Sequence, residues 1–422
     1  VQPLLARLAE WIHALGVDAL AGVSDEVAEH AGPLTRLDER VAHQMPESDE
    51  ALYAELATTG STAWALLQRS ITSQLSADVR MPDGTTDRMP INAVRGLASN
   101  NDPDLRRAGY DAELEAWPTI ATTVAAAMNA IKGEAVVVNR RRNWESPIDA
   151  SLYANSVSRA TYDAMQRAVT DSLPDWRRWM RSKARLHGHT DGLPWWDLVA
   201  PVPDGDTSLS WTEGVDWVRD AFASYSSELG GLVDRALDER WIDAPPADGK
   251  SGGAFCAPFR DDRSLVLLNW SGSIDSAQTT AHELGHAYHN VTLAARTPLQ
   301  RRLPMALAET ASIFCETLAI ERRLETTTDP SARLTLLDVS LIGPNQIVVD
   351  IASRLQFETA VFERREHGTL GVAELNALML EAQADTYGDG IDQTTRHPYM
   401  WLLKPHYYAS HFYNWPYTYG LL

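Results

Sequence analysis

The segment His-Glu-Leu-Gly-His at residues 282–286 joins side chains that can bind a metal ion to one that can activate water. His282 and His286 are four residues apart, so on a helix their imidazoles lie one turn apart on the same face. Both rings can then reach one ion, because a zinc–nitrogen bond is about 2.0–2.1 Å long. Glu283 lies about 100° further round the helix, in the position of a general base that acts on a metal-bound water. The spacing predicts a catalytic zinc site.

The neighbours of this motif bear on the alternative interpretation, an accidental match on a surface helix. They are small or apolar, as a buried helix that carries a metal requires: Ala281, Leu284, Gly285 and Ala287. The sequence therefore favours a metal site over a chance match.

A catalytic zinc ion needs a third protein ligand and one position left open for water. His289 shares a face with His282, but seven residues rise about 10.5 Å along a helix, so one ion cannot contact both of these and His286. Glu309 lies in an otherwise apolar stretch, where a carboxylate is costly to bury without a partner. Glu309 is therefore the predicted third ligand; the alternative is a favourable charge near the start of its own helix. Glu316, two turns later, is a candidate for orienting a ligand histidine.

The segment 397–422 is rich in imidazoles and phenols. Such groups can donate hydrogen bonds to an oxyanion. The alternative is an aromatic core patch whose hydroxyl groups are satisfied internally. The candidates are three histidines and six tyrosines: His397, His406, His411, Tyr399, Tyr407, Tyr408, Tyr413, Tyr417 and Tyr419.

Most of the chain has the periodicity of α-helices. Leucines and Ile12 recur at three- and four-residue spacing in residues 3–20, and residues 49–75 form a second helical stretch that Gly60 interrupts. Helical patterns also cover much of the rest of the chain. The sequence therefore predicts a mostly α fold with one small β-sheet.

That small sheet is predicted directly before the metal-binding motif, and so beside the active site. Residues 254–259 and 264–270 are short apolar runs separated by the charged residues 260–263, which is typical of a β-hairpin. Asp275, with Gln278 three residues later, is predicted to cap the helix that carries the motif.

A polar turn at residues 81–90 contains two prolines and a glycine and is the predicted domain boundary. It divides the chain into an N-terminal helical domain, residues 1–80, and a catalytic domain, residues 81–422.

Composition limits the classes of protein. The 422 residues carry a formal net charge of -20, which argues against nucleic acid or an anionic membrane as a partner, since both attract a basic surface. Cys256 and Cys315 are too few cysteines for a disulfide framework and fit a reducing cytoplasm, although a cysteine-poor secreted enzyme is also compatible with this count. No stretch has the ~20 apolar residues of a membrane span, and the start lacks the apolar segment of a secretory signal. We therefore expect a cytoplasmic protein, of an oligomeric state that the sequence does not indicate.

Three segments together resemble the oligoendopeptidase F branch of the thimet-oligopeptidase family of zinc metallopeptidases. They are AHELGHAYHN at 281–290, LAETASIFCE at 307–316 and KPHYYASHFYNWPYTYGLL at 404–422. The same family character extends to residues 106–117, 145–159 and 240–259, so the resemblance covers essentially the whole chain. Members usually begin earlier and continue further, so we expect this chain to lack parts of both ends, including the C-terminal end of the catalytic domain.

The resemblance implies a mostly helical fold with a deep channel, in which short peptides are cleaved while folded proteins are excluded. It assigns His282, His286 and Glu309 as the ligands of one zinc ion per chain. It assigns Glu283 as the catalytic base and acid.

The resemblance also implies that the C-terminal segment holds the oxyanion. His406, Tyr413 and Tyr417 match the family positions best. Three other tyrosines are alternatives within the uncertainty of the register: Tyr407, Tyr408 and Tyr419.

Residues 252–256 resemble the family strand beside the cleft. An extended substrate could add to such an edge through main-chain hydrogen bonds. Gly253, Ala254 and Phe255 are therefore the predicted substrate-binding residues.

The predicted function is hydrolysis of internal peptide bonds in short oligopeptides. One alternative is a metallocarboxypeptidase on a similar helical scaffold, which would need a basic group for the terminal carboxylate of its substrate. The other is a catalytically weak peptide-binding protein. Glu283 argues against the latter, because binding alone needs no general base.

Overall fold

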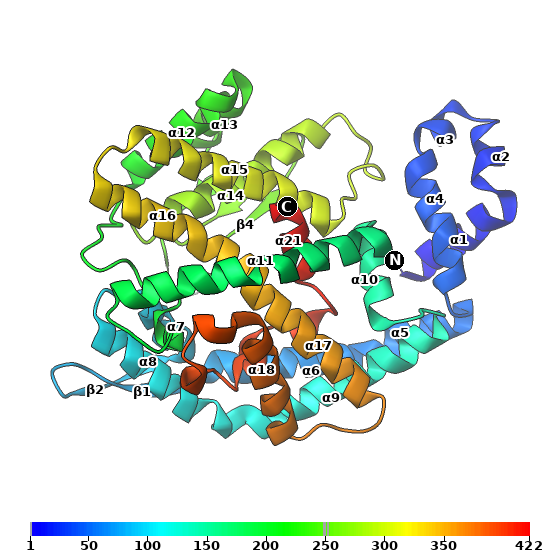
Figure 1. The fold of residues 1–422 in the computed structure, drawn as a ribbon. Helices are drawn as coiled ribbons and strands as arrows, with labels where there is room; N and C mark the ends of the chain where they lie inside the picture. Colours follow the sequence, from blue (N-terminus) through cyan, green and yellow to red (C-terminus); the bar gives the residue numbers. More distant parts are fainter. Residues whose placement is uncertain (1, 248–249, 251–252) are drawn as a thin grey trace.

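The computed structural model describes residues 2–247, 250 and 253–422 and shows a predominantly helical chain with two small β-sheets (Figure 1). The N-terminal part contains α1 (Gln2–Leu15), α2 (Val17–Ala21), α3 (Asp25–Glu29), α4 (Ala31–Arg40), α5 (Glu47–Thr59) and α6 (Ser61–Gln74). After the strands β1 (Ser76–Arg80) and β2 (Thr86–Pro90) come α7 (Ile91–Gly96), α8 (Pro103–Ala116), α9 (Pro118–Arg141), α10 (Pro147–Asn155) and α11 (Arg159–Leu186).

The second half carries the predicted site. It contains α12 (Trp211–Tyr225), α13 (Ser227–Asp238), β3 (Ile242–Asp243), β4 (Phe255–Pro258), β5 (Ser264–Leu267), α14 (Ile274–Leu293), α15 (Met305–Thr326) and α16 (Pro330–Asn345). A π-helical turn (Gln346–Asp350) leads into α17 (Ile351–Arg365) and α18 (Val372–Tyr387). The tail forms α19 (Met400–Leu403), α20 (His406–Ala409) and α21 (Trp415–Leu421). The fold is therefore mostly α, as predicted.

Two local signals show how the sequence sets helix boundaries. Gly60 separates α5 from α6, as predicted, and a Cβ there would lie only 2.8 Å from a carboxylate oxygen of Glu134. Helix α14 begins directly after Ser273, whose hydroxyl accepts a hydrogen bond from the Ser276 backbone N–H at 3.2 Å. The predicted cap at Asp275 is therefore wrong, because that residue already lies in the first helical turn.

The predicted β-hairpin is confirmed. β4 pairs antiparallel with β5, with Phe255 opposite Leu267 and Pro258 opposite Ser264. β3 pairs parallel with the other side of β5, so the order is β3-β5-β4 and β4 is an edge strand.

A second sheet lies where the sequence predicts only a polar turn. β1 and β2 pair antiparallel, with Ser76 opposite Pro90. Most of β2 is exposed and polar, so it lacks the apolar alternation by which a strand is recognised in a sequence. This hairpin spans the predicted boundary, and the division into residues 1–80 and 81–422 stays a prediction.

Two helical stretches are long and apolar enough to cross a membrane by length and composition alone. They are α9 and the nearly continuous helix Pro330–Arg365, and 44% and 39% of their apolar windows are buried inside the structure. Core helices of globular proteins pass the same test, so these helices are weak evidence for a membrane span.

Two main cores lie in different parts of the molecule. In Figure 1, α12–α15 occupy the upper part of the view and α6, α8 and α9 the lower part, with α11, α17 and α21 between them. The lower core includes these fully buried side chains: Trp117, Met128, Phe357, Trp401 and Tyr407. The upper core includes Val218, Phe222, Ala281, Leu284 and Ala319, and it fixes the helix that carries the metal-binding motif.

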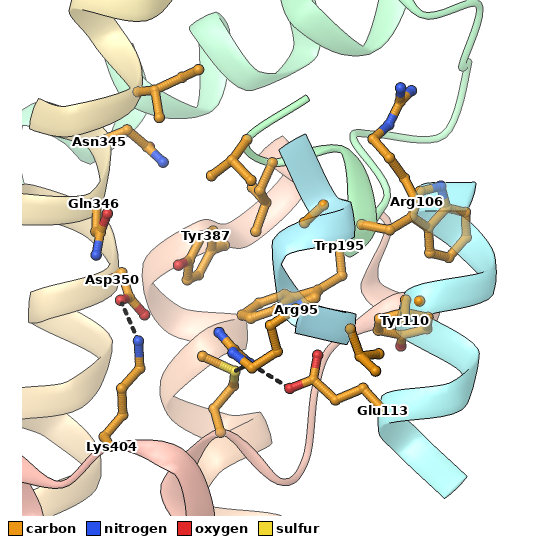
Figure 2. A pocket seen from close by; sticks show the side chains of 18 residues that line it. Arg95, Arg106, Tyr110, Glu113, Trp195, Asn345, Gln346, Asp350, Tyr387 and Lys404 are labelled. Carbon is orange, nitrogen blue, oxygen red and sulfur yellow. Dashed lines mark hydrogen bonds and ion pairs between the residues drawn. The ribbon is translucent and has the colours of Figure 1, made fainter. Parts of the chain in front are cut away.

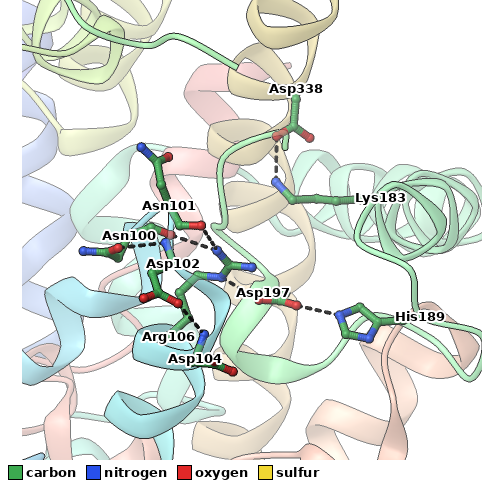
Figure 3. Close-up of polar contacts among 9 residues, drawn as sticks. All are labelled: Asn100, Asn101, Asp102, Asp104, Arg106, Lys183, His189, Asp197 and Asp338. Carbon is green, nitrogen blue, oxygen red and sulfur yellow. Dashed lines mark hydrogen bonds and ion pairs between the residues drawn. The ribbon is translucent and has the colours of Figure 1, made fainter. Parts of the chain in front are cut away.

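Buried ion pairs connect segments that are distant in the sequence (Figure 3). The Lys183 ammonium on α11 donates to the Asp338 carboxylate on α16 at 2.7 Å. Asp197 accepts from the Arg106 guanidinium at 2.7 Å, and its second oxygen lies 2.7 Å from His189 Nε2. Burial lowers the pKa of Lys183 and raises the pKa of Asp338, so each charged form loses more from desolvation than it gains.

We predict that Asp338→Leu lowers the free energy of unfolding by about 3 kcal/mol, because it leaves the buried Lys183 ammonium without a partner. The double variant Lys183→Met/Asp338→Leu is expected to recover to within about 1 kcal/mol of the parent chain. Urea denaturation followed by circular dichroism measures both.

Asp389→Ala is the matched control, since it removes the exposed contact of Asp389 with Arg181 on the same helix as Lys183. Its cost should stay below about 1 kcal/mol. A double variant no more stable than Asp338→Leu alone would contradict the explanation by desolvation.

Candidate metal centre

The centre is built where α14 packs directly against α15. A Cβ at Gly285 would lie 2.8 Å from the Ser312 Cα atom and 2.9 Å from the Ala311 carbonyl oxygen. Contacts this short exclude a side chain, so the glycine lets the two helix backbones approach closely. This approach sets the distance between the motif on α14 and the acidic residues on α15.

The three predicted metal ligands lie together. One nitrogen each of His282 and His286 and one oxygen of Glu309 are all within 4.8 Å of one another. Glu309 Oε2 is 3.4 Å from His282 Nε2 and 3.7 Å from His286 Nε2. Ligand atoms of a tetrahedral zinc ion are ~3.4 Å apart, given bonds of about 2.1 Å. Two imidazoles and one carboxylate, with a fourth position free for water, therefore fit a zinc ion.

Further hydrogen bonds orient these ligands. Glu316 Oε2 lies 3.2 Å from His282 Nδ1, which directs the other ring nitrogen toward Glu309. The Ser312 hydroxyl donates to Glu309 Oε2 at 3.1 Å. A carboxylate behind a ligand histidine fixes both its ring orientation and its tautomer, which is the role predicted for Glu316.

The charges of the centre favour a cation. Burial lowers the pKa of His282, but hydrogen bonds with Glu309 and Glu316 outweigh it and raise the pKa to about 10. Burial and the charge on His282 lower the pKa of His286 to about 4. Burial opposes ionisation of Glu309, but its contact with His282 lowers the pKa of this carboxyl. The carboxylates thus stabilise positive charge here, which a proton on His282 or a metal ion can supply.

Glu283 lies beside the ligands on α14 and is nearly inaccessible. Its side chain is 5% exposed, and its Oε2 atom makes no hydrogen bond with the described part of the chain. Burial raises the pKa of Glu283 to about 7. A desolvated carboxylate of this kind is suited to accept a proton near neutral pH.

The C-terminal helix brings part of the tail against this centre. A Cβ at Gly420 would lie 2.9 Å from the Glu309 carbonyl carbon, so a glycine is needed where α21 meets α15. The rings of His406 and Tyr413 stack, with centroids 4.8 Å apart and planes inclined by 9°. The Tyr417 ring centroid lies 6.3 Å from that of Tyr413. Burial and then the negative charge of Glu309 raise the pKa of Tyr417.

The alternative tyrosines are packed elsewhere. Tyr407 and Tyr408 are 0% and 3% exposed in the lower core, and the Tyr408 hydroxyl donates to the Trp401 carbonyl at 2.9 Å. Tyr419 packs against a third apolar cluster. The aromatic-core interpretation therefore describes Tyr408, whereas the buried Tyr407 hydroxyl makes no hydrogen bond within the described residues.

The remaining tail histidines are also remote from the ligand cluster. His397 is fully buried, and its backbone N–H donates to the Gln383 side-chain oxygen at 3.0 Å. His411 accepts from the Lys132 ammonium at 3.2 Å. Neither side chain belongs to the group of His282, His286 and Glu309.

A buried ion network that the sequence analysis missed holds the tail in place. Arg354 on α17 pairs with Asp350 and donates to Asn414 Oδ1, the residue before α21, at 3.1 Å. The Lys404 ammonium, just before α20, lies 3.7 Å from Asp350, as Figure 2 shows. The signal in the sequence is the acid–base pair Asp350 and Arg354, four residues apart within an apolar helix.

A cavity of about 190 Å³ adjoins this network (Figure 2). Arg95 pairs with Glu113 on one side, and Lys404 contacts Asp350 on the other. None of the predicted ligands or substrate-binding residues lines this cavity, so it lies outside the metal centre.

Of two other cavities, only the smaller has a predicted ligand among its described lining residues. The larger, of about 1480 Å³, is bordered by Met305 at the start of α15 and by Tyr413. The smaller, of about 330 Å³, contains His286 and His289, and Leu303 borders both. His289 thus lies beside the cleft and outside the ligand cluster, as its spacing predicts. Leu303 belongs to the walls of both cavities, and the deep channel stays a prediction.

The predicted substrate-binding stretch lies at the same cleft. Gly253 borders the larger cavity, and Phe255, the first residue of the edge strand β4, is 48% exposed. Ala254 lies between them, before the strand begins. Residue 252 of this stretch lies outside the described residues. The pairing of a substrate with this edge stays a prediction.

The part of the chain that carries the metal centre matches a known family of peptidases. Residues 224–421 match Peptidase family M3. This segment contains α14, α15 and the tail, and therefore every predicted ligand and oxyanion donor.

Several relatives of known sequence are named oligoendopeptidase F. The chain is 26% identical over 396 residues to an oligoendopeptidase F homolog of Lactococcus lactis subsp. lactis, covering 91% of this chain and 64% of that protein. It is 22% identical over 395 residues to oligopeptidase PepF of Bacillus subtilis, covering 92% and 58%. The resemblance to oligoendopeptidase F is thus confirmed, and this chain spans less than two thirds of the length of these two relatives.

Solved structures share the fold. A putative peptidase from Chlamydophila abortus has a TM-score of 0.82 at 22% identity, covering all of this chain and 70% of the other. Oligoendopeptidase-F from Enterococcus faecium has a TM-score of 0.72 at 19% identity, covering 98% and 69%. The helical fold predicted from the sequence is therefore also that of these structures.

We predict that Gly285→Ala weakens zinc binding by about tenfold or more, because the added methyl group separates α14 from α15 and overpacking costs about 1–3 kcal/mol. Zinc titration against a competing chelator measures the affinity. Gly231→Ala on α13 is the control, since no atom lies within 4 Å of an added Cβ there. Equal zinc affinities in the two variants would contradict the assigned role of Gly285.

Proposed function

We propose that this chain is a zinc-dependent endopeptidase that hydrolyses internal bonds of short oligopeptides and binds one zinc ion. The observation that carries the proposal is the cluster of His282, His286 and Glu309 beside the buried, unpartnered carboxylate of Glu283. The similarity to oligoendopeptidase F supports peptides as substrates. The free thiols Cys256 and Cys315 fit the cytoplasmic location that the composition predicts.

In the proposed reaction, His282, His286 and Glu309 would hold a zinc ion, which would supply a Lewis acid that lowers the pKa of a bound water molecule. Glu283 accepts the proton of that water as it attacks the scissile carbonyl, and then delivers the proton to the leaving amine. Its raised pKa, about 7, suits both steps. Glu316 meanwhile keeps the His282 ring in the orientation that its ligand role requires.

His406, Tyr413 and Tyr417 are the proposed donors to the tetrahedral oxyanion. Burial raises the pKa of Tyr417, so its phenol keeps the proton that it donates. Burial lowers the pKa of His406 to about 4, so its imidazole is neutral at pH 7 and has one N–H to donate.

Glu283→Gln is predicted to bind zinc with the affinity of the parent chain while kcat falls by about 10²–10⁴-fold, because the amide cannot accept the proton. Zinc content by atomic absorption and turnover of a quenched fluorescent peptide give the two readouts. Glu321→Gln, at an exposed position on α15, should change neither. Full turnover by Glu283→Gln would remove the residue from its role as general base.

A blocked substrate tests the proposed function itself. A quenched oligopeptide that is acetylated and amidated should be cleaved by the parent chain, lose cleavage on chelation and regain it with added zinc. Mass spectrometry of the products identifies the bond. Cleavage restricted to peptides with a free C-terminus would favour the carboxypeptidase alternative, and zinc binding without any cleavage would favour the peptide-binding alternative.

A further inference from the structure

The charge of the larger cavity differs from that of the whole chain. Aspartate and glutamate make up 57 of the 422 residues, a frequency that would place about four among the thirty residues lining this cavity. None of the described residues that line this cavity is acidic. A chain with a formal net charge of -20 therefore keeps carboxylates out of the walls of its largest described cavity.

Two of the basic lining residues are already neutralised or paired. Lys404 lies 3.7 Å from Asp350, and burial, together with the Arg354 charge, lowers its pKa to about 7. His411 is half-buried beside Lys132, and desolvation lowers its pKa well below the usual range.

Arg69 is the remaining cation of the cavity wall. It lies on α6, on the part of the wall that the N-terminal helices provide, and its side chain is exposed. Within the described residues, its guanidinium has no hydrogen bond or ion pair, whereas Gln68 beside it donates to the Leu402 carbonyl at 2.8 Å. An arginine with free donors in a wall without acids is arranged to accept a carboxylate.

We propose that Arg69 binds a carboxylate of the peptide substrate and gives the channel a preference for peptides that carry negative charge there. The carboxylate is that of a glutamate or aspartate side chain or of the peptide C-terminus. This inference rests on the proposed function, because it takes the cavity to be the peptide channel. It gives the N-terminal helices a part in substrate selection, although the metal centre lies entirely in the second half of the chain.

Binding to an inactive variant tests the inference separately from catalysis. In the Glu283→Gln background, fluorescence anisotropy measures the Kd of labelled oligopeptides with one sequence and different charges. One set compares a free with an amidated C-terminus, and the other compares an internal glutamate with glutamine. Arg69→Gln should raise Kd about fivefold for whichever anionic peptide binds Arg69, and leave the amidated glutamine peptide unchanged. The effect should weaken as salt rises.

Matched variants make the result decisive. Arg69→Lys keeps the charge and should retain most of the preference, whereas Arg69→Glu should reverse it. Arg167→Gln removes an exposed arginine from α11, outside the cavity wall, and should leave every Kd unchanged. Equal Kd changes for neutral and anionic peptides, or none for any peptide, would overturn the role of Arg69.

Turnover distinguishes this inference from the proposed function. The parent chain should cleave the neutral, end-blocked peptide, and Arg69→Gln should cleave it at the same rate. If the parent chain binds the anionic peptides through Arg69 but cleaves none of them, the proposed function fails and the carboxylate site stands. If the parent chain cleaves all of them without a charge preference, the proposed function stands and the carboxylate site fails.

Discussion

The close packing of α14 on α15 is the constraint on which the rest of the centre depends. Gly285 leaves no room for a side chain between the helices, and this brings Glu309 within 3.4 Å and 3.7 Å of the two histidine rings. A wider separation would leave the carboxylate buried without a cation, at a cost of several kcal/mol. The geometry that suits a zinc ion and the electrostatic stability of the helix pair thus have the same origin.

The tail adds a third layer to this helix pair. Gly420 has the same packing role as Gly285, since its lack of a side chain lets α21 lie against the backbone of Glu309. Contacts with α17 also fix this segment, because Arg354 pairs with Asp350 and donates a hydrogen bond to Asn414. Buried ion pairs contribute little net stability, but they specify one arrangement, because any other leaves a charge unpaired.

The large cavity differs in charge from the chain as a whole. The net charge of the chain is -20, yet the described wall of the large cavity has basic groups and no acidic one. Net charge alone would suggest that basic peptides are attracted, since the field of the whole molecule steers ligands. Within a cavity, however, the nearest side chains dominate, because exposed charges are screened over about 8–10 Å.

The sequence by itself determined the features that depend on neighbours along the chain. Helical periodicity, the break at Gly60 and the β4–β5 hairpin are set by local spacing, and so is the pairing of two histidines one helical turn apart. An acid in an apolar stretch also indicated Glu309 as a partner for them. The prediction from local sequence was wrong where two residues could cap the same helix. The N-cap of α14 is Ser273, and the predicted cap Asp275 lies in the first turn.

Only the tertiary structure decided what depends on which faces meet. It separated Tyr413, which borders the large cavity, and Tyr417 on α21 from the core tyrosines, although all lie in one aromatic segment. It paired the exposed, polar strand β2 with β1. It also placed Arg69 in the wall of a cavity and Arg354 in a buried network of ion pairs. Burial and long-range contacts are properties of packed surfaces, so no periodicity within one segment can reveal them.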